Sequence, residues 1–174
     1  PLTYNIDPKS IREKITDKTK AIIAVDFTGQ VVEIDEIRRI CEEHNLILIE
    51  DAAHSIGSSY NGKMVGNLAD MTTFSFHPVK TVTAGEGGAI LTNDDELYKK
   101  LVLAHTHGIT HNEAYMEEAP HEGEWYYEQI SLGFNYRMTD FQAALLLSQL
   151  SKLDKFRNRR QEIVEAYNEA FADI

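Results

Sequence analysis

The chain has 174 residues, of which 43% are hydrophobic and 26% are charged, and its formal net charge is −11. This is an ordinary globular composition, which argues against disorder. The excess of acidic residues argues against nucleic acid or an anionic membrane as a partner, because either would require a basic surface. The single cysteine, Cys41, excludes an intrachain disulfide and suits a reducing compartment such as the cytoplasm. No apolar run approaches the roughly 20 residues that a membrane-spanning helix needs.

The first 51 residues predict a short helix followed by a strand–helix–strand unit. Asp7 and Pro8 mark the start of the first helix, because Asp is a good N-cap and Pro costs nothing at the first helical position. Two continuous apolar runs, residues 21–25 and 46–49, are typical of strands buried in a parallel sheet. Between them, apolar side chains recur at helical spacing over residues 34–43. This order indicates a parallel sheet and the α/β class.

The pattern changes after residue 51. Residues 60–63 (Tyr-Asn-Gly-Lys) have the turn chemistry of a short hairpin. Residues 71–76 and 88–92 are rich in β-forming side chains and predict two further strands.

The second half predicts helices on either side of a long irregular segment. Helical periodicity runs from Asp94 to about Ala104. Residues 105–130 are rich in His, Glu and Gly without a clear period, which indicates a long functional loop. From Thr139 to the end almost all residues are helix formers, and Thr139 or Asp140 is the expected N-cap.

Two predicted strand ends carry candidate catalytic or cofactor-binding residues. Asp51 ends one strand and is followed closely by His54, whereas Ser75 ends another and precedes Lys80. Ligands of open α/β sheets bind beyond the carboxyl ends of the strands. A lysine amine, a carboxylate and a hydroxyl there suit pyridoxal phosphate, whose aldehyde, ring nitrogen and phosphate they would respectively contact. By residue type alone, Asp51 is more often a helix cap and Lys80 a solvated loop residue.

Three blocks in this order make the pattern more specific: residues 50–57 (EDAAHSIG), 74–80 (FSFHPVK) with 85–89 (GEGGA), and 135–144 (NYRMTDFQAA). Together they resemble the sugar-nucleotide aminotransferases of the DegT/DnrJ type, which belong to the fold-type I pyridoxal-phosphate enzymes. The resemblance covers essentially the whole chain. It is strongest to members that act on UDP-linked 4-keto sugars, namely the transaminases that make UDP-4-amino-4,6-dideoxy-N-acetyl-β-L-altrosamine for pseudaminic acid synthesis. The UDP-4-amino-4-deoxy-L-arabinose aminotransferases are the nearest alternative.

The resemblance implies a role for each of five residues. Lys80 is the expected Schiff-base lysine and proton shuttle, and Asp51 is the expected partner of the pyridinium nitrogen. His54 matches the position that faces the phenolic oxygen of the cofactor. Ser75 is the expected phosphate contact, whereas Asn135 is expected to reach across a homodimer interface to the phosphate of the neighbouring subunit.

The resemblance also implies a fold and a domain organisation. The expected architecture is a three-layer α/β/α large domain with a mostly parallel sheet, present only in part. Residues 1–150 match the central part of this cofactor-binding domain, and residues 151–174 match a helix leading toward a small domain. Family members are longer, and the chain opens with Pro1, so an upstream phosphate loop and the small domain are expected elsewhere in a longer protein. We therefore expect the 174 residues to fold but not to transaminate alone. The expected substrates are glutamate and a UDP-linked 4-keto sugar.

Several alternatives remain open at the level of sequence. Asp26 stands where many family members carry histidine, which leaves substrate contacts there undetermined. His105, His107 and His111 resemble a metal-binding tract, but their window contains no carboxylate, so a solvated loop is favoured. A non-catalytic homologue that keeps the fold is a further alternative. A related sugar dehydratase is disfavoured, because that class typically carries histidine in place of Lys80.

Overall fold

The computed structural model describes residues 3–116, 123 and 125–173. Its Cα positions form two compact units, the first made of residues 1–92 with 140–174 and the second of residues 93–139. Each unit is described by itself below. Within the described residues, no helix is long and apolar enough to cross a membrane.

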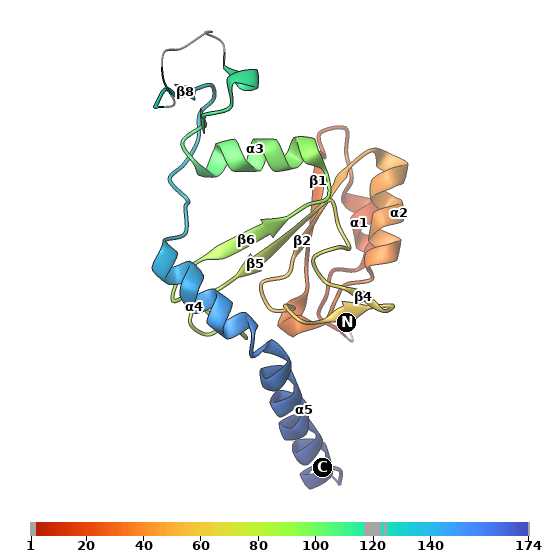
Figure 1. Ribbon diagram of the computed structural model, residues 1–174. Coiled ribbons are helices and arrows are strands. Elements are labelled where there is room, and N and C mark those ends of the chain that lie inside the picture. Colours follow the sequence, from red (N-terminus) through yellow and green to blue (C-terminus); the bar gives the residue numbers. More distant parts are fainter. Residues whose placement is uncertain (1–2, 117–122, 124, 174) are drawn as a thin grey trace. The chain divides into compact units, whose positions relative to one another are not determined.

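A four-stranded sheet is the centre of the first unit (Figure 1). Its strands lie in the order β1 (Ala21–Val25), β2 (Ile47–Asp51), β5 (Met71–Ser75) and β6 (Gly88–Leu91). The first three strands are parallel to one another, and β6 is antiparallel to β5. The predicted α/β class with a mostly parallel sheet is confirmed.

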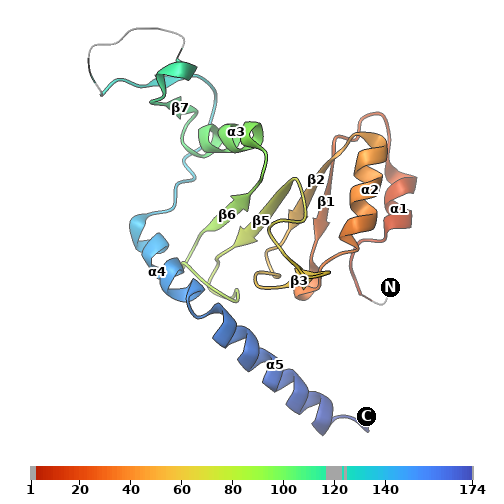
Figure 2. The same ribbon diagram turned by 45° about the vertical axis from the view of Figure 1, so that its right-hand side comes forward.

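Two helices, α1 (Pro8–Lys14) and α2 (Ile34–His44), lie side by side next to β1 and β2 (Figure 2). Their buried side chains form one core cluster with the inward side chains of the two strands. Its members include Ile11, Ile37, Ile40, Ile22 and Leu48. Burying a large apolar side chain stabilises the fold by about 1.5–3 kcal/mol. This stabilisation explains why the two helices cover this face of the sheet.

The opposite face of the sheet is open. Along β1 and β2 the side chains alternate between buried and accessible, so that Ile23 is 61% exposed and Ile47 is 41% exposed. Val25 lies opposite Asp51 in the register, and Asp51 lies opposite Thr73 of β5. Asp51 therefore belongs to the open face, at the edge where the parallel strands end.

Local sequence signals account for the ends of several elements. The Asp7 carboxylate accepts a hydrogen bond from the Lys9 N–H group, which confirms it as the N-cap of α1. The hairpin of β3 (Ser59–Tyr60) and β4 (Lys63–Met64) is joined by Asn61 and Gly62, which both have positive φ. Such φ values are those of the hairpin turns that Asn-Gly favours. Two helices, α4 (Asp140–Leu150) and α5 (Leu153–Ala170), occupy the helix-forming segment after Thr139.

The second unit holds more regular structure than the sequence predicts. Its helix α3 (Asp95–His105) begins after the N-cap Asp94, in agreement with the predicted helix. The segment predicted as a loop contains β7 (Ile109–Thr110), the 3-10 turn η2 (Glu113–Tyr115) and β8 (Glu128–Gln129). The strands β7 and β8 pair antiparallel. Because this pairing joins residues far apart in the chain, local periodicity cannot show it, and the expectation of a wholly irregular loop is wrong. Residues 117–122 and 124 of that segment lie outside the described residues.

Candidate active site

Asp51 occupies the last position of β2, on the open face of the sheet. Its Oδ1 atom accepts a hydrogen bond of 3.1 Å from the Ala53 N–H group, whereas its Oδ2 atom has no partner among the described residues. A turn follows, and no helix begins there, so a helix cap is not its role. The side chain is partly accessible and presents a free carboxylate oxygen at the carboxyl edge of the sheet.

His54 lies in the turn after Asp51, and it is exposed. Its carbonyl oxygen is approached closely by Gly29, which ends the 3-10 turn η1 (Phe27–Gly29) after β1. A Cβ atom at Gly29 would lie 3.0 Å from that oxygen, and Gly29 has a φ of 94°. This close approach requires glycine and fixes the backbone beneath His54.

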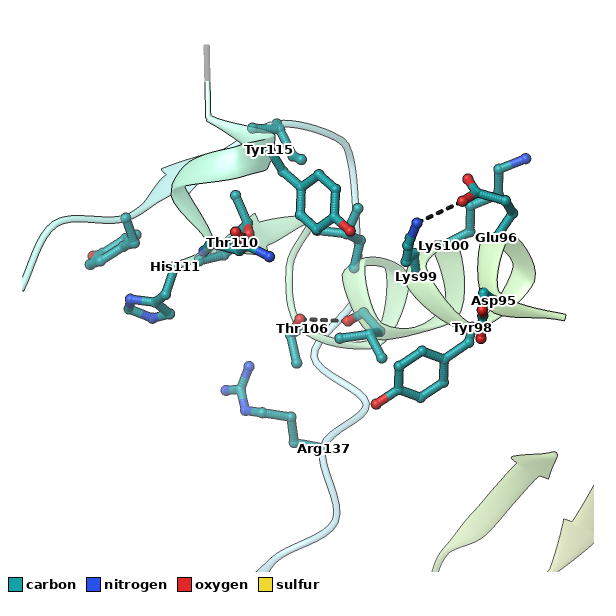
Figure 3. Close-up of a pocket in the computed structure, with 16 residues that line it drawn as sticks. Asp95, Glu96, Tyr98, Lys99, Lys100, Thr106, Thr110, His111, Tyr115 and Arg137 are labelled. Carbon is teal, nitrogen blue, oxygen red and sulfur yellow. Dashed lines mark hydrogen bonds and ion pairs between the residues drawn. The ribbon is translucent and has the colours of Figure 1, made fainter. Parts of the chain in front are cut away.

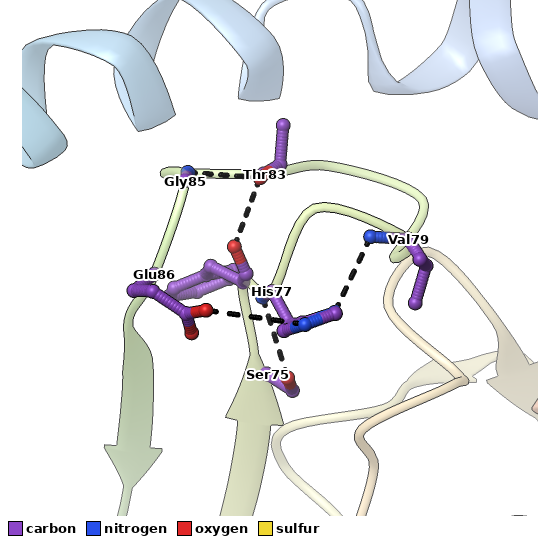
Figure 4. Close-up of polar contacts among 7 residues, drawn as sticks. Ser75, His77, Val79, Thr83, Gly85 and Glu86 are labelled. Carbon is purple, nitrogen blue, oxygen red and sulfur yellow. Dashed lines mark hydrogen bonds and ion pairs between the residues drawn. The ribbon is translucent and has the colours of Figure 1, made fainter.

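Lys80 lies in the loop between β5 and β6, which is held by a set of backbone and hydroxyl contacts (Figure 4). The Thr83 hydroxyl donates to the Phe76 carbonyl oxygen at 3.0 Å and accepts from the Gly85 N–H group at 2.9 Å. The Lys80 N–H group donates to the His77 carbonyl oxygen at 3.0 Å. The Lys80 side chain is half-buried and makes no hydrogen bond or ion pair within the part of the chain that the structure describes. Its amine is therefore unpaired within these residues.

Ser75 ends β5 on the same sheet face as Asp51, because Asp51 pairs with Thr73 two residues earlier. The Ser75 hydroxyl oxygen accepts a long hydrogen bond of 3.4 Å from the His77 N–H group. His77 Nε2 lies 3.9 Å from Glu86 Oε1, and both side chains are exposed, so this ion pair is weak. His77 thus contributes to the shape of the loop.

Four of the five predicted site residues therefore come from neighbouring strand ends of the first unit: Asp51, His54, Ser75 and Lys80. Asn135 belongs to the second unit, where it forms an isolated β-bridge with Thr106. Its role at a cofactor remains a prediction.

A buried layer of polar side chains lies on the other face of the same strand ends. Glu50 and Asp26 are both 0% exposed. Glu50 Oε2 accepts from the Thr72 hydroxyl at 2.8 Å, whereas its Oε1 atom has no hydrogen-bond partner among the described residues. Burial, together with the negative charge of nearby Asp26, raises the pKa of Glu50 to about 7.

Asp26 is directed into this layer. Its Oδ2 atom accepts from the Ser55 hydroxyl at 2.6 Å and its Oδ1 atom accepts from the Val32 N–H group at 3.0 Å. Burial also raises the pKa of Asp26. The Asp26 side chain is buried and does not reach the open face, so it is not placed to contact a substrate there. The alternation of β1, in which Ala24 is buried, was the available signal for this orientation.

A separate cavity of about 910 Å³ lies in the second unit (Figure 3). Its wall includes Tyr98, Tyr115, His111 and Arg137, and Lys99 there is already paired with Glu96. None of the five predicted site residues lines this cavity. Within the described ranges, no group of three or more His, Cys, Asp and Glu side chains could hold a metal ion.

The free amine of Lys80, the free carboxylate oxygen of Asp51, the His54 imidazole and the Ser75 hydroxyl fit pyridoxal phosphate. The set offers one group for each polar part of that cofactor, at the sheet edge where α/β proteins bind ligands. An amine, a carboxylate and a hydroxyl at adjacent strand ends of a mostly parallel sheet are what a pyridoxal-phosphate transferase would require.

Comparison with known proteins identifies the family within this class. Residues 1–174 match the DegT/DnrJ/EryC1/StrS aminotransferase family, and the chain belongs to it. It is 41% identical over 170 residues to a UDP-4-amino-4,6-dideoxy-N-acetyl-β-L-altrosamine transaminase of Campylobacter jejuni, covering 96% of this chain and 43% of that one. It is also 41% identical over 174 residues to a GDP-perosamine synthase of Caulobacter vibrioides, covering 100% of this chain and 44% of the other.

The fold agrees with a solved structure of the same kind. The pyridoxal-phosphate form of a putative sugar aminotransferase from Streptococcus pneumoniae superposes with a TM-score of 0.85 at 31% identity, covering 98% of this chain and 46% of that one. The chain thus spans less than half the length of each of these three proteins.

Proposed function

We propose that the protein containing this chain is a pyridoxal-phosphate-dependent aminotransferase. It transfers an amino group from glutamate to the 4-keto carbon of a UDP-linked 4-keto-6-deoxy sugar, in cell-surface polysaccharide or pseudaminic acid synthesis. The observation that carries this proposal is the unpaired amine of Lys80 next to strand ends that present Asp51 and Ser75 on one open sheet face. The family assignment supports it.

The residues divide the work by their chemistry. When bound, pyridoxal phosphate supplies a ring that accepts the electrons released when a C–H bond beside the amine is broken. Lys80 Nζ would hold the cofactor through its aldehyde and would otherwise serve as the base that accepts and returns a proton. The Asp51 carboxylate would hold a proton on the ring nitrogen. His54 would donate a hydrogen bond to the phenolic oxygen, and the Ser75 hydroxyl would donate to the phosphate.

The remaining parts of the proposal concern assembly and domains. Asn135 completes the phosphate site of a neighbouring subunit in a cytoplasmic homodimer. Residues 1–150 form the central part of the cofactor-binding domain, and residues 151–174 lead toward a small domain carried elsewhere in the protein. Because the chain spans less than half of its relatives, we propose that it folds alone without transaminating.

The most specific part of the proposal is the identity of the sugar-nucleotide substrate. The relatives named for a UDP sugar and for a GDP sugar are equally similar at 41% identity, so identity alone does not separate the nucleotides. The UDP-4-amino-4-deoxy-L-arabinose type of reaction is the second candidate. A non-catalytic homologue is disfavoured, because a binding-only protein has no need to keep Lys80, Asp51 and Ser75 together.

Chemical reduction tests the central assignment. The full-length protein is incubated with pyridoxal phosphate, reduced with borohydride and digested, and the labelled peptide is identified by mass spectrometry. We expect the label on Lys80 and no label in Lys80→Ala, whereas Lys63→Ala, which removes an exposed lysine of the hairpin, remains labelled. A label on another lysine of the wild-type protein contradicts the assignment.

Product analysis then tests the substrate. Glutamate is supplied with a UDP-linked or a GDP-linked 4-keto-6-deoxy sugar, and the configuration of the product at C4 is determined. Turnover of the UDP sugar supports the proposal, and exclusive turnover of the GDP sugar contradicts it.

A further inference from the structure

We propose that Asp26 is a positioning residue, which acts through Ser55 to hold the turn of residues 51–55 at the carboxyl end of β2. This turn carries Asp51 and His54. The inference therefore rests on the proposed function, in which both side chains contact the cofactor.

Asp26 is bonded to both ends of this turn. Its backbone N–H group donates to the Asp51 carbonyl oxygen at 3.0 Å, and its Oδ2 atom accepts from the Ser55 hydroxyl at 2.6 Å. Its other carboxylate oxygen accepts from the Val32 N–H group at 3.0 Å, which fixes the orientation of the carboxyl group. Asp26 and Ser55 are both 0% exposed, so water does not compete for these bonds. One residue thus spans the turn from its first residue to its last.

The loop that follows Asp26 also contacts this turn, through Gly29. Gly29 approaches the His54 carbonyl oxygen so closely that a Cβ atom there would lie 3.0 Å away. The Ser58 hydroxyl donates to the Gly29 carbonyl oxygen at 3.0 Å, which ties the loop to the chain beyond the turn. A serine hydroxyl donates both contacts, at 2.6 Å for Ser55 and 3.0 Å for Ser58, but only the first lies within the turn that carries the site residues.

The Asp26–Ser55 bond is the strongest of these contacts. A hydrogen bond from an O–H group to a carboxylate is roughly twice as strong as a hydrogen bond between neutral partners. Removal of the hydroxyl also leaves a buried carboxylate oxygen with one donor fewer. Without this bond the turn should open locally more often, because the free energy of local opening is lower for a segment that is held by fewer contacts. Site residues need to be held within about 0.5 Å of their productive positions.

The test uses Ser55→Ala in the full-length protein, with Ser58→Ala as the matched control. The first measurement is hydrogen exchange of the amides of residues 51–55 in the cofactor-free protein. We expect about fivefold to tenfold faster exchange in Ser55→Ala, and less than about twofold in Ser58→Ala. Asp26→Asn keeps an oxygen for the Val32 N–H group and places an amide NH2 group opposite Ser55. This group can donate to the Ser55 oxygen but cannot accept from it, so we expect a smaller change in the same direction.

The second measurement reports on the cofactor. We expect Ser55→Ala to bind pyridoxal phosphate about tenfold more weakly and to shift the pH midpoint of the visible absorbance of the bound cofactor, whereas Ser58→Ala leaves both unchanged. The inference is overturned if Ser55→Ala and Ser58→Ala have the same exchange rates, or if exchange rises in Ser55→Ala while affinity and spectrum stay those of the wild type. A wild-type protein that binds no pyridoxal phosphate overturns the proposed function as well, which distinguishes the two failures.

Discussion

Replacement of Glu50 by glutamine should remove a pH dependence of stability that the buried carboxyl group imposes on the first unit. Glu50 is 0% exposed, and its Oε1 atom has no hydrogen-bond partner within the described residues. Burial, reinforced by the charge of Asp26, raises the pKa of Glu50 from 4.5 to about 7. Glutamine has the same shape and still offers an oxygen to the Thr72 hydroxyl, which donates to Glu50 at 2.8 Å.

The sign of the effect follows from proton binding. Between pH 4.5 and about 7 the folded chain holds a proton on Glu50 that the unfolded chain has lost. The contribution of Glu50 to stability is therefore complete below pH 4.5, decreases as the pH rises through this window, and is lost above about pH 7. A difference of about 2.5 pKa units corresponds to about 3 kcal/mol in the free energy of unfolding.

The assay is urea denaturation of the 174-residue chain at pH 5 and pH 8, followed by far-UV circular dichroism. Fluorescence is less suitable, because the single tryptophan, Trp125, lies in the other unit. At pH 8 we expect Glu50→Gln to be more stable than the wild type by about 3 kcal/mol, with a smaller difference at pH 5. Glu13→Gln, the same change at an exposed position of α1, serves as the control. The reasoning is refuted if the wild type and Glu50→Gln lose the same stability between the two pH values.

Three further substitutions probe the site. Asp51→Asn should lower kcat more than it changes KM, because the carboxylate matters most when charge develops on the ring, and steady-state kinetics with near-normal kcat would reduce Asp51 to a turn residue. Gly29→Ala should destabilise the chain by about 1–3 kcal/mol, since φ is 94° and the new Cβ atom would meet the His54 carbonyl; an unchanged Tm would show that the loop relaxes freely. Thr83→Val should loosen the loop that carries Lys80, which limited proteolysis would detect as faster cleavage between β5 and β6 than in the wild type.

The sequence alone determined the elements whose signals are local. The strand at residues 21–25, the N-cap at Asp7 and the Asn-Gly hairpin all depend on side chains within a few positions of one another, and the structure has each of them. The identity of the candidate site residues also came from sequence, because Asp51 and Lys80 stand in ordered blocks with a known family pattern.

The tertiary structure decided which side chains share a face and which segments pair. Strand register places Asp51 on the open face and Glu50 in the buried layer, although the two residues are adjacent in the chain. The bond between Asp26 and Ser55 and the pairing of β7 with β8 join residues that are distant in sequence. Local propensity carries no information about such contacts, because they form only when the folded chain brings distant segments together.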